Sequence, residues 1–293
     1  MSSTRSRRWP RLLGAIVAGL VLVVTVVGAG VNAVVGQLQG NIKAVDVSAE
    51  LGAGATQAPL VVDEATGDLK PVNILLMGSD TRSGKGNGGF GSASEIGGER
   101  SDTSIPRDTW ITLPKCTSKS GKTVGGYKGR FNTAYDLGGP ACTLKAVNEM
   151  TGVDVTNFMV VDFGGFKRIV EALGGVEICL AADVNDSKSG LHLTKGKHVV
   201  TGAEALAFVR VRHGIGDGSD TSRIRRQQAF LSSLARQALS SGTLLNPAKL
   251  VSVLNAATSS LTADTQLANL DNLKSLLVSM KGVRPNDITL SLI

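Results

Sequence analysis

The longest apolar run of the chain lies near its start, where residues 12–35 carry no charged side chain and one strongly polar one, Asn32. A helix of this length spans the hydrocarbon core of a bilayer. Four arginines and no acid precede the run, in residues 1–11. Because cationic flanks stay in the cytoplasm, we predict an uncleaved signal anchor, with all later residues outside the cell.

Short apolar runs and helical periodicities alternate further on. Residues 36–70 mix Gly, Ala, Gln and Asp and are predicted to form a stalk. Apolar runs at 71–77, 158–163 and 176–180 predict buried strands, while apolar spacings of three and four predict helices at 132–151 and 165–173. Glycine-rich residues 83–98 and residues 111–127 are expected to be loops, and 183–199 a hairpin or flap. The alternation predicts an α/β fold.

Two further helices flank a glycine-rich turn at residues 214–218. The first, at 201–212, begins with the capping-box residues Thr201 and Glu204, and Asp220 is predicted to cap the second. The expected core face of the second helix comprises Ile224, Gln227, Gln228, Leu231, Leu234 and Leu239. Its first turns carry Arg223, Arg225 and Arg226, which oppose the helix dipole, so a bound anion would account for them. Helices at 247–257 and 267–280 and a strand at 287–293 complete the prediction.

The net charge of the 293-residue chain is +7, which favours anionic partners such as phosphates, anionic lipid or nucleic acid. Its three histidines lack the spacing of a metal site, and its cysteines lack zinc-type clustering. The chain has no P-loop, no G-x-S-x-G sequence and no plausible catalytic cysteine. The extracellular placement and the lack of a recognition-helix motif argue against nucleic acid.

Charged and polar residues that local structure does not explain gather in three stretches. They are Asp80 and Arg82; Arg100, Asp102, Arg107 and Asp108; and Arg210, Arg212, Asp220, Arg223 and Gln227. Residues 100–110 are either a solvated polar loop or half of a site for a metal and phosphates. Two acids on loops can hold Mg²⁺, and arginines can grip a pyrophosphate, a combination that suits phosphoryl transfer. Salt-bridged surface helices give similar lists, so spacing alone leaves both interpretations open.

Longer motifs carry a resemblance to a known family. They are NILLMGSDTR (73–82), RSDT (100–103), SIPRDTW (104–110), RFNTAYDLGGP (130–140), VVDFGGFKRIVEALGGVEICL (160–180), SGLHLTKGKHVVTGAEALAFVRVRH (189–213) and DTSRIRRQQAFL (220–231). Through them the chain resembles the LytR-CpsA-Psr family of bacterial cell-wall ligases. The resemblance implies a central mixed β-sheet flanked by helices, an α/β/α sandwich preceded by one N-terminal transmembrane helix. It implies a single-pass type II membrane protein whose residues 71–293 form the extracellular catalytic domain.

The family resemblance also implies an activity. Members transfer a glycopolymer, such as teichoic acid or arabinogalactan, from a polyprenyl-pyrophosphate carrier to peptidoglycan. By motif, Asp80 and Asp102 resemble the acids that bind Mg²⁺ or Mn²⁺. The residues Arg100, Arg107, Arg210, Arg212 and Arg223 resemble the pyrophosphate clamp, Asp220 and Gln227 its polar support, and Arg82 and Arg130 further ligand contacts. The polyprenyl tail would lie along strand 158–163, helix 165–173 and the helix face at 224–234, unless these residues are ordinary core.

The chain departs from the family where Thr103 is followed directly by Ser104, because relatives carry two strands between these positions. The ends of a hairpin lie about 5 Å apart. The five residues from Asp102 to Arg107 reach roughly 16 Å, so both can keep their places. About six lost aliphatic side chains at about 1.5–3 kcal/mol each would nevertheless rival the stability of a domain. Either another segment fills the gap, or the protein folds poorly, or the sequence is a defective or misread copy. The alternative function is a catalytically impaired or inactive homologue that only binds polyprenyl phosphate lipids.

Three cysteines remain to be assigned, and an extracellular location permits a disulfide. Cys116, in a loop, and Cys142, in a helix near the site, are the expected pair. Cys179 is expected to be a free thiol buried in a strand. The C-terminal end is expected to be truncated relative to the family, since relatives continue past the last strand.

Overall fold

The computed structural model describes residues 25, 28–51, 72–80, 101–103, 105–187, 189–211, 215 and 218–279. The chain divides into two compact units, residues 1–40 and 41–293. Residues 28–40 of the first unit are helical. Most of the predicted anchor lies outside the described residues, and those that are described include no helix with the length and apolarity of a membrane span.

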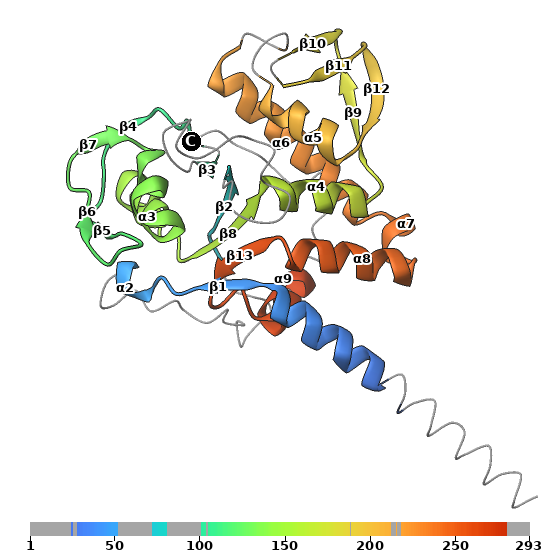
Figure 1. Ribbon diagram of the computed structural model, residues 1–293, viewed down its shortest axis with the longest axis horizontal. Coiled ribbons are helices and arrows are strands. Elements are labelled where there is room, and N and C mark those ends of the chain that lie inside the picture. Colours follow the sequence, from blue (N-terminus) through green and yellow to red (C-terminus); the bar gives the residue numbers. More distant parts are fainter. Residues whose placement is uncertain are drawn as a thin grey trace, which may run out of the picture. The chain divides into compact units, whose positions relative to one another are not determined.

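A five-stranded mixed sheet forms the centre of the second unit, in the order β1-β13-β8-β2-β3 (Figure 1). Its strands are β1 (Lys43–Val45), β2 (Ile74–Ser79), β3 (Ser101–Asp102), β8 (Asn157–Asp162) and β13 (Leu261–Asp264). The pairs β1–β13 and β2–β8 are parallel, whereas β13–β8 and β2–β3 are antiparallel. The sheet draws β1 from the segment predicted to be a stalk, and β1 leads into the short helix α2 (Ser48–Leu51).

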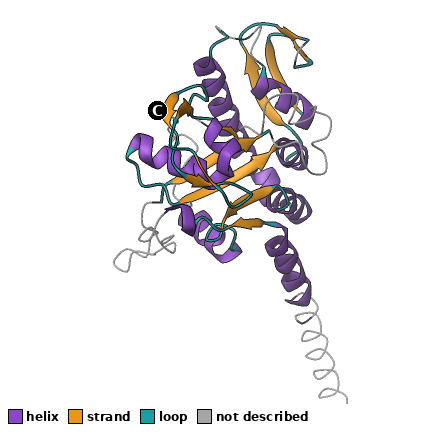
Figure 2. Ribbon diagram, turned by 60° about the vertical axis from the view of Figure 1, so that its left-hand side comes forward, coloured by secondary structure: helices purple, strands orange, loops and turns teal. Residues whose placement is uncertain are grey.

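Helices cover both faces of this sheet (Figure 2). On one face Phe158 and Val160 of β8 pack with α3 (Thr133–Thr151), while on the other Met159 packs with α9 (Leu270–Ser279). This alternation follows from the two-residue period of a strand, and it confirms the expected α/β fold with a mixed sheet between helices. The predicted helix 132–151 is confirmed as α3, and its last turn is closed by Gly152 at φ +70°, a conformation that glycine adopts without strain.

A second core lies beside the sheet, around β9 (Val176–Leu180) and β12 (Gly196–Val200), which pair antiparallel. The predicted hairpin is β10 (Val184–Asp186) with β11 (Leu191–Leu193). Three helices, α4 (Phe163–Ala172), α5 (Gly202–Arg210) and α6 (Asp220–Ala238), enclose this core. The chain then continues through α7 (Ser241–Leu244) and α8 (Pro247–Thr258) to β13. The capping box at Thr201 and Glu204 is confirmed.

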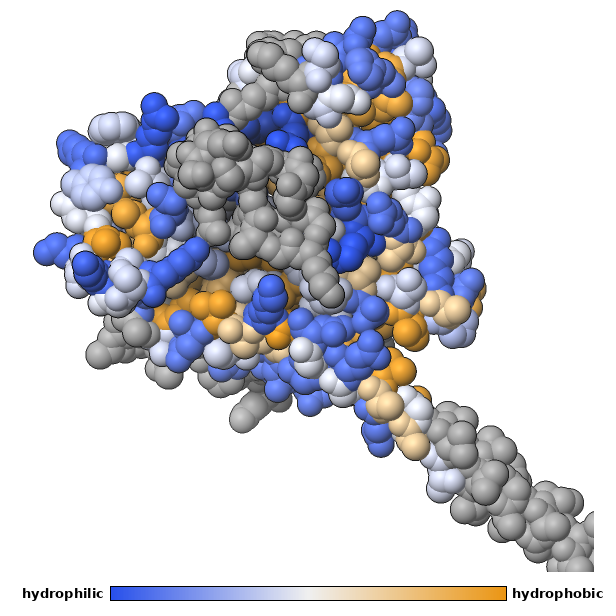
Figure 3. Space-filling view, in the orientation of Figure 1, coloured by the Kyte–Doolittle hydropathy of each residue, from blue (hydrophilic) through white to orange (hydrophobic). Residues whose placement is uncertain are grey.

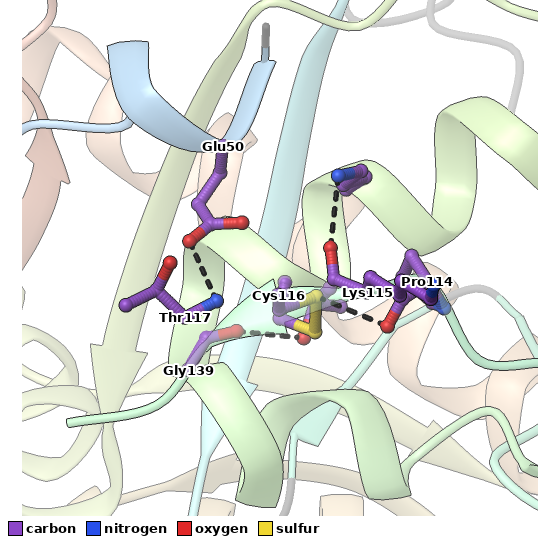
Figure 4. Close-up of a disulfide and its surroundings, with 9 residues drawn as sticks. Glu50, Pro114, Lys115, Cys116, Thr117 and Gly139 are labelled. Carbon is purple, nitrogen blue, oxygen red and sulfur yellow. Dashed lines mark hydrogen bonds between the residues drawn. A yellow bond between two sulfur atoms is a disulfide. The ribbon is translucent and has the colours of Figure 1, made fainter. Parts of the chain in front are cut away.

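The expectation of a loop at residues 111–127 is wrong. This segment and its flanks form two ribbons, β4 (Trp110–Thr112) with β7 (Lys128–Arg130) and β5 (Cys116–Thr117) with β6 (Thr123–Val124). Each strand has only two or three residues, too few to show a hydrophobic period. Tertiary contacts hold them instead, including the predicted disulfide between Cys116 and Cys142 of α3, which is confirmed. Beside this bond Glu50 of α2 accepts a hydrogen bond from the backbone of Thr117, at 2.7 Å (Figure 4).

Cys179 is free, as expected, but it is exposed rather than buried. Its neighbours Ile178 and Leu180 point into the core, so the alternation along β9 turns Cys179 outward.

The predictions for α6 also need two corrections. Ser219, not Asp220, caps the helix, because its side chain accepts a hydrogen bond from the backbone of Ser222. Leu231 and Leu239 are exposed, whereas Ile224 and Phe230 are buried together with Arg223 and Arg226. The helix is therefore turned so that two arginines face the interior. The predicted segments at 83–98 and 287–293 lie outside the described residues.

Candidate functional site

The carboxyl ends of β2 and β8 lie side by side at one edge of the sheet, with Ser79 opposite Asp162. Asp80 directly follows β2, and its neighbour Ser79 is buried. In the antiparallel pair of β2 with β3, residue 102 stands opposite Gly78 and Ser101 stands opposite Ser79. Backbone alternation therefore places positions 80 and 102 on the same face, two residues out of direct register.

Asn132, in the turn before α3, holds the two halves of the charged segment together. Its side-chain oxygen accepts a hydrogen bond from the backbone N–H of Ser101 at 3.0 Å. Its own backbone N–H donates to the carbonyl of Arg107 at 3.1 Å. Sequence reasoning passed over Asn132, although it stands inside the motif RFNTAYD.

A hydrogen bond spans the point where Thr103 is followed directly by Ser104. The hydroxyl of Thr103 accepts a hydrogen bond from the backbone N–H of Ile105 at 3.1 Å. Ile105 is only 6% exposed and joins the core that contains α3. The short connection therefore buries an apolar side chain of its own, and it keeps Arg107 within reach of β3.

Asp108 links two of the predicted arginines. Its carboxylate lies 3.5 Å from Nε of Arg107 and 3.7 Å from Nη1 of Arg130. The side chain of Arg107 is 24% exposed, against 67% for Arg130. Exposed ion pairs of this length contribute little to stability, so the guanidinium group of Arg130 can turn toward a ligand at small cost.

Arg210 joins the second half of the site to the sheet edge. It is the last residue of α5, and its guanidinium carbon lies 4.7 Å from the ring centroid of Phe163. Phe163 begins α4 immediately after Asp162, whose carboxylate caps that helix by accepting from the backbone N–H of Gly165 at 2.6 Å. Because β8 neighbours β2, this cation–π contact places Arg210 on the strand end beside the one that carries Asp80.

The carboxyl end of α5 is held by α6. Arg226 donates from Nε to the carbonyl of Phe208 at 3.1 Å and from Nη2 to the carbonyl of Val211, and Gln227 donates to the carbonyl of Val209 at 3.2 Å. The last carbonyls of a helix lack intrahelical partners, so these three bonds satisfy them and fix the turn that bears Arg210.

The sequence predicted Arg226 only as one of three arginines near the start of a helix, where a bound anion would account for them. In the structure its partners are backbone carbonyls of the protein itself. Burial, and then the charge of Arg223, lowers the pKa of Arg226 from its ordinary value. The carbonyls at the end of α5 carry partial negative charge that compensates the buried guanidinium. Sequence periodicity could not distinguish this structural arginine from Arg223 or Arg225, since it shows position on the helix but not the tertiary partner.

The remaining predicted residues are described in part. Arg82, Arg100 and Arg212 lie outside the described residues, and for Asp102 and Asp220 only the backbone is described. Arg223 is 6% exposed, so it lies at the inner side of α6. Phe158, Val170 and Phe230, from the three segments considered for a lipid tail, are each below 2% exposed and fill the cores. For these three residues ordinary core is the correct interpretation.

The same sheet edge is where a divalent cation was expected. Within the described ranges there is no group of three or more His, Cys, Asp or Glu side chains placed to hold a metal ion. The register nevertheless brings positions 80 and 102 to one face of the sheet, with Gly78 directly opposite position 102. Carboxylate oxygens are the donors that Mg²⁺ prefers, and it commonly takes one or two carboxylates with its remaining ligands from water and phosphate. The residues at this edge thus fit the ion.

Fold and site together define an α/β protein in which two separate parts of the chain bring Arg210, over Phe163, and the segment of Arg107, linked to Ser101 through Asn132, to one mixed sheet. Comparison with known proteins identifies the family to which this α/β protein belongs. The chain belongs to the LytR_cpsA_psr family, whose model matches residues 34–291. The resemblance found in the sequence is therefore confirmed.

Named relatives support this membership. The cell wall biosynthesis protein LcpA of Corynebacterium glutamicum is 33% identical, over 92% of this chain and 60% of its own length. The Bacillus anthracis polyisoprenyl-teichoic acid–peptidoglycan teichoic acid transferase TagU is 30% identical, over 77% of this chain and 73% of its own. The crystal structure of TagV from B. subtilis superposes with a TM-score of 0.53 at 25% identity, covering 75% of this chain and 82% of that one. The chain thus spans about three fifths of the length of the Corynebacterium relative.

Proposed function

We propose that this protein is a membrane-anchored phosphotransferase that moves a glycopolymer from a polyprenyl-pyrophosphate carrier to peptidoglycan. The observation that carries the proposal is the placement of Arg210, which α6 fixes over Phe163 beside the strand end of Asp80. The name of the Bacillus anthracis relative, a polyisoprenyl-teichoic acid–peptidoglycan teichoic acid transferase, supports the choice of donor and acceptor.

In the proposed step, an oxygen of an acceptor hydroxyl forms a bond to the phosphorus that bears the glycan. The bond from that phosphorus to the bridging oxygen breaks, and its electron pair leaves with the polyprenyl phosphate. The hydroxyl proton ends on this departing phosphate. Arg107, Arg210 and Arg223 would neutralise the charge that develops on the phosphate oxygens, which is the main requirement of phosphoryl transfer.

The remaining predicted residues complete this proposal. Arg82, Arg100, Arg130 and Arg212 would add contacts to the same phosphates, with Asp220 and Gln227 as support. Asp80 and Asp102 would hold Mg²⁺ or Mn²⁺, which when bound supplies positive charge against the phosphates. The basic tail and apolar run at residues 1–35 would anchor the chain in the cell membrane, with its second unit outside.

The test is a transfer assay with the full-length chain in detergent, lipid-linked glycopolymer labelled in its glycan, and purified peptidoglycan. We expect label to enter peptidoglycan, and Arg210→Ala to slow the transfer by roughly 10²–10³-fold, the loss typical when one preorganised donor to a developing charge is removed. Lys274→Ala, an exposed cation on α9, is the matched control and should transfer at the wild-type rate.

Two other outcomes are informative. Transfer by Arg210→Ala at the wild-type rate would remove the proposed role of this residue. Tight binding of the lipid-linked donor with no label in peptidoglycan, at any Mg²⁺ concentration, would instead identify the impaired homologue that only binds polyprenyl phosphate lipids.

A further inference from the structure

The ribbon of β4 and β7 has one buried and one exposed face. Trp110 pairs with Arg130, Ile111 with Gly129, and Thr112 with Lys128. Ile111 packs against the core and Gly129 is buried, where an added Cβ would lie 2.8 Å from the side chain of Leu113. The other four residues are exposed, and we call them the ribbon face: Trp110, Thr112, Lys128 and Arg130.

Trp110 is unusual for a side chain on a short, tightly packed ribbon, because 66% of its surface is exposed. A tryptophan offers a broad apolar ring with a polar N–H at its edge, which explains why this residue type dominates binding energy when a partner covers it. Thr112 and Lys128 on the same face offer hydrogen-bond donors beside the ring.

The segment around the ribbon is also strongly basic. Residues 109–135 contain five cationic side chains and no acidic one. They are Lys115, Lys119, Lys122, Lys128 and Arg130, and all five are exposed. This excess of five charges is large against a net charge of +7 for the whole chain. In the space-filling view, hydrophilic side chains cover most of the region over these ribbons, with apolar patches between them (Figure 3). A basic surface with an exposed aromatic ring is complementary to an anionic polymer that also has apolar patches.

The ribbon face begins at the candidate site. Trp110 is three residues after Arg107, and the carboxylate of Asp108 contacts both Arg107 and Arg130. A polymer that reached the arginines of the sheet edge with one of its hydroxyl groups would continue along β4 and β7. A lipid tail would not suit this face, because charged and hydroxyl side chains surround its single aromatic ring.

We infer that the ribbon face binds the acceptor, the glycan strand of peptidoglycan, and so sets where along the strand transfer occurs. The C–H faces of the pyranose rings would stack on Trp110, and carboxylates of the attached peptides would pair with Lys128. This inference rests on the proposed function, since it is that function which requires a glycan acceptor. Arg130 is left out of its test because the family resemblance gives this residue a phosphate contact.

The first experiment uses tryptophan fluorescence. The chain has two tryptophans, Trp9 and Trp110, so the full-length Trp9→Phe variant reports on Trp110 alone. Soluble peptidoglycan fragments should shift the emission of Trp110 to shorter wavelength as water is displaced from the ring, and unlabelled polyprenyl phosphate should leave it unchanged. An emission that stays constant at saturating fragment concentration would overturn the inference.

The second experiment measures pelleting of the full-length chain with peptidoglycan sacculi stripped of attached polymers. Trp110→Ala should weaken this binding by about tenfold or more, the size of loss seen when a central interface aromatic is truncated. Lys128→Glu should weaken it as well, and the wild-type affinity should fall as salt is raised. The matched controls are Leu245→Ala, at an apolar residue that is 81% exposed, and Lys274→Glu on α9.

The outcomes separate this inference from the proposed function. Equal pelleting of Trp110→Ala and the wild-type chain, or an equal loss in Leu245→Ala, would overturn the ribbon face, whatever the transfer assay shows. A chain that pellets through Trp110 but transfers nothing would overturn the proposed function and leave this surface standing as a glycan-binding site. Unchanged melting temperature and unchanged binding of the lipid-linked donor in Trp110→Ala would show that the variant is folded.

Discussion

Asn132 carries no charge, yet it connects β3, the segment of Arg107 and the start of α3. It satisfies the backbone N–H of Ser101, a residue that is 3% exposed, and it also binds the carbonyl of Arg107. Charged motifs drew attention to the acids and arginines, whereas the residue that brings them together is a neutral amide. Sequence patterns could not reveal this role, because a hydrogen bond between residues 31 positions apart produces no periodicity in the sequence.

Asn132→Ala should lower the free energy of unfolding by about 1–3 kcal/mol, because it leaves a buried N–H without its acceptor. It should also weaken binding of the lipid-linked donor, since Ser101, and with it the strand that carries position 102, loses its link to the turn before α3. Asn132→Asp keeps the acceptor oxygen and should restore donor binding. Calorimetry of unfolding and a donor-binding titration check both effects, and wild-type donor affinity in Asn132→Ala would contradict the positioning role.

Arg225 and Arg226 offer a second comparison between neighbouring residues. Arg226 is 9% exposed and binds two carbonyls of α5, whereas Arg225 is exposed on the same helix. Arg226→Ala should therefore destabilise the protein by roughly 2–4 kcal/mol, as buried carbonyls lose a charged donor. Arg225→Ala should change stability by less than about 0.5 kcal/mol. Equal denaturant midpoints for the two variants would show that the bonds to α5 contribute nothing.

Among the elements, strands and helices whose ends are marked by glycine were predicted well. The strand at 176–180 and the helix ended by Gly152 match β9 and α3 closely. The β4–β7 and β5–β6 ribbons were missed, because strands of two or three residues depend on tertiary contacts rather than on their own pattern. Leu231 was predicted to be buried but is exposed, and tertiary contacts again explain the difference. The buried Arg223 and Arg226, rather than the leucines, determine which face of α6 points into the core.

The disulfide is the clearest of these tertiary contacts, since it ties β5 to α3 across 26 residues. Replacing both Cys116 and Cys142 by Ser should cost about 3 kcal/mol, which corresponds to roughly 6–12 °C in melting temperature for a domain of this size. Cys179→Ser is the matched control and should leave the melting temperature unchanged, because its thiol is free and exposed. A melting temperature that does not respond to loss of the bond would contradict this account.

For the whole molecule, the sequence pattern predicted α/β layering and the family resemblance implied a mixed sheet between helices, but the start of the domain was placed too late. The boundary at residue 71 followed from the low apolar content of residues 36–70. In the structure β1 extends the sheet beside β13, and Val47 is completely buried. A three-residue strand and one valine are too small a signal to stand out from a segment of mixed composition.

A chain that begins at residue 71 should consequently be less stable than one that begins at residue 41. It loses the pairing of β1 with β13, the hydrogen bond from Thr117 to Glu50 and the buried side chain of Val47, which alone contributes about 1.5–3 kcal/mol. Thermal unfolding of the two fragments measures the difference. Identical melting temperatures would mean that residues 41–51 are dispensable to the fold.

The exposure of Cys179 has a consequence for how the chain matures. Three cysteines allow three alternative single disulfides, of which one is native, and the leftover thiol stays accessible after folding. An accessible thiolate attacks disulfides in its own chain or in another. Oxidative refolding should thus divide between the native isomer, scrambled isomers and covalently linked pairs of chains, and the yield of native protein should rise when Cys179 is replaced by serine.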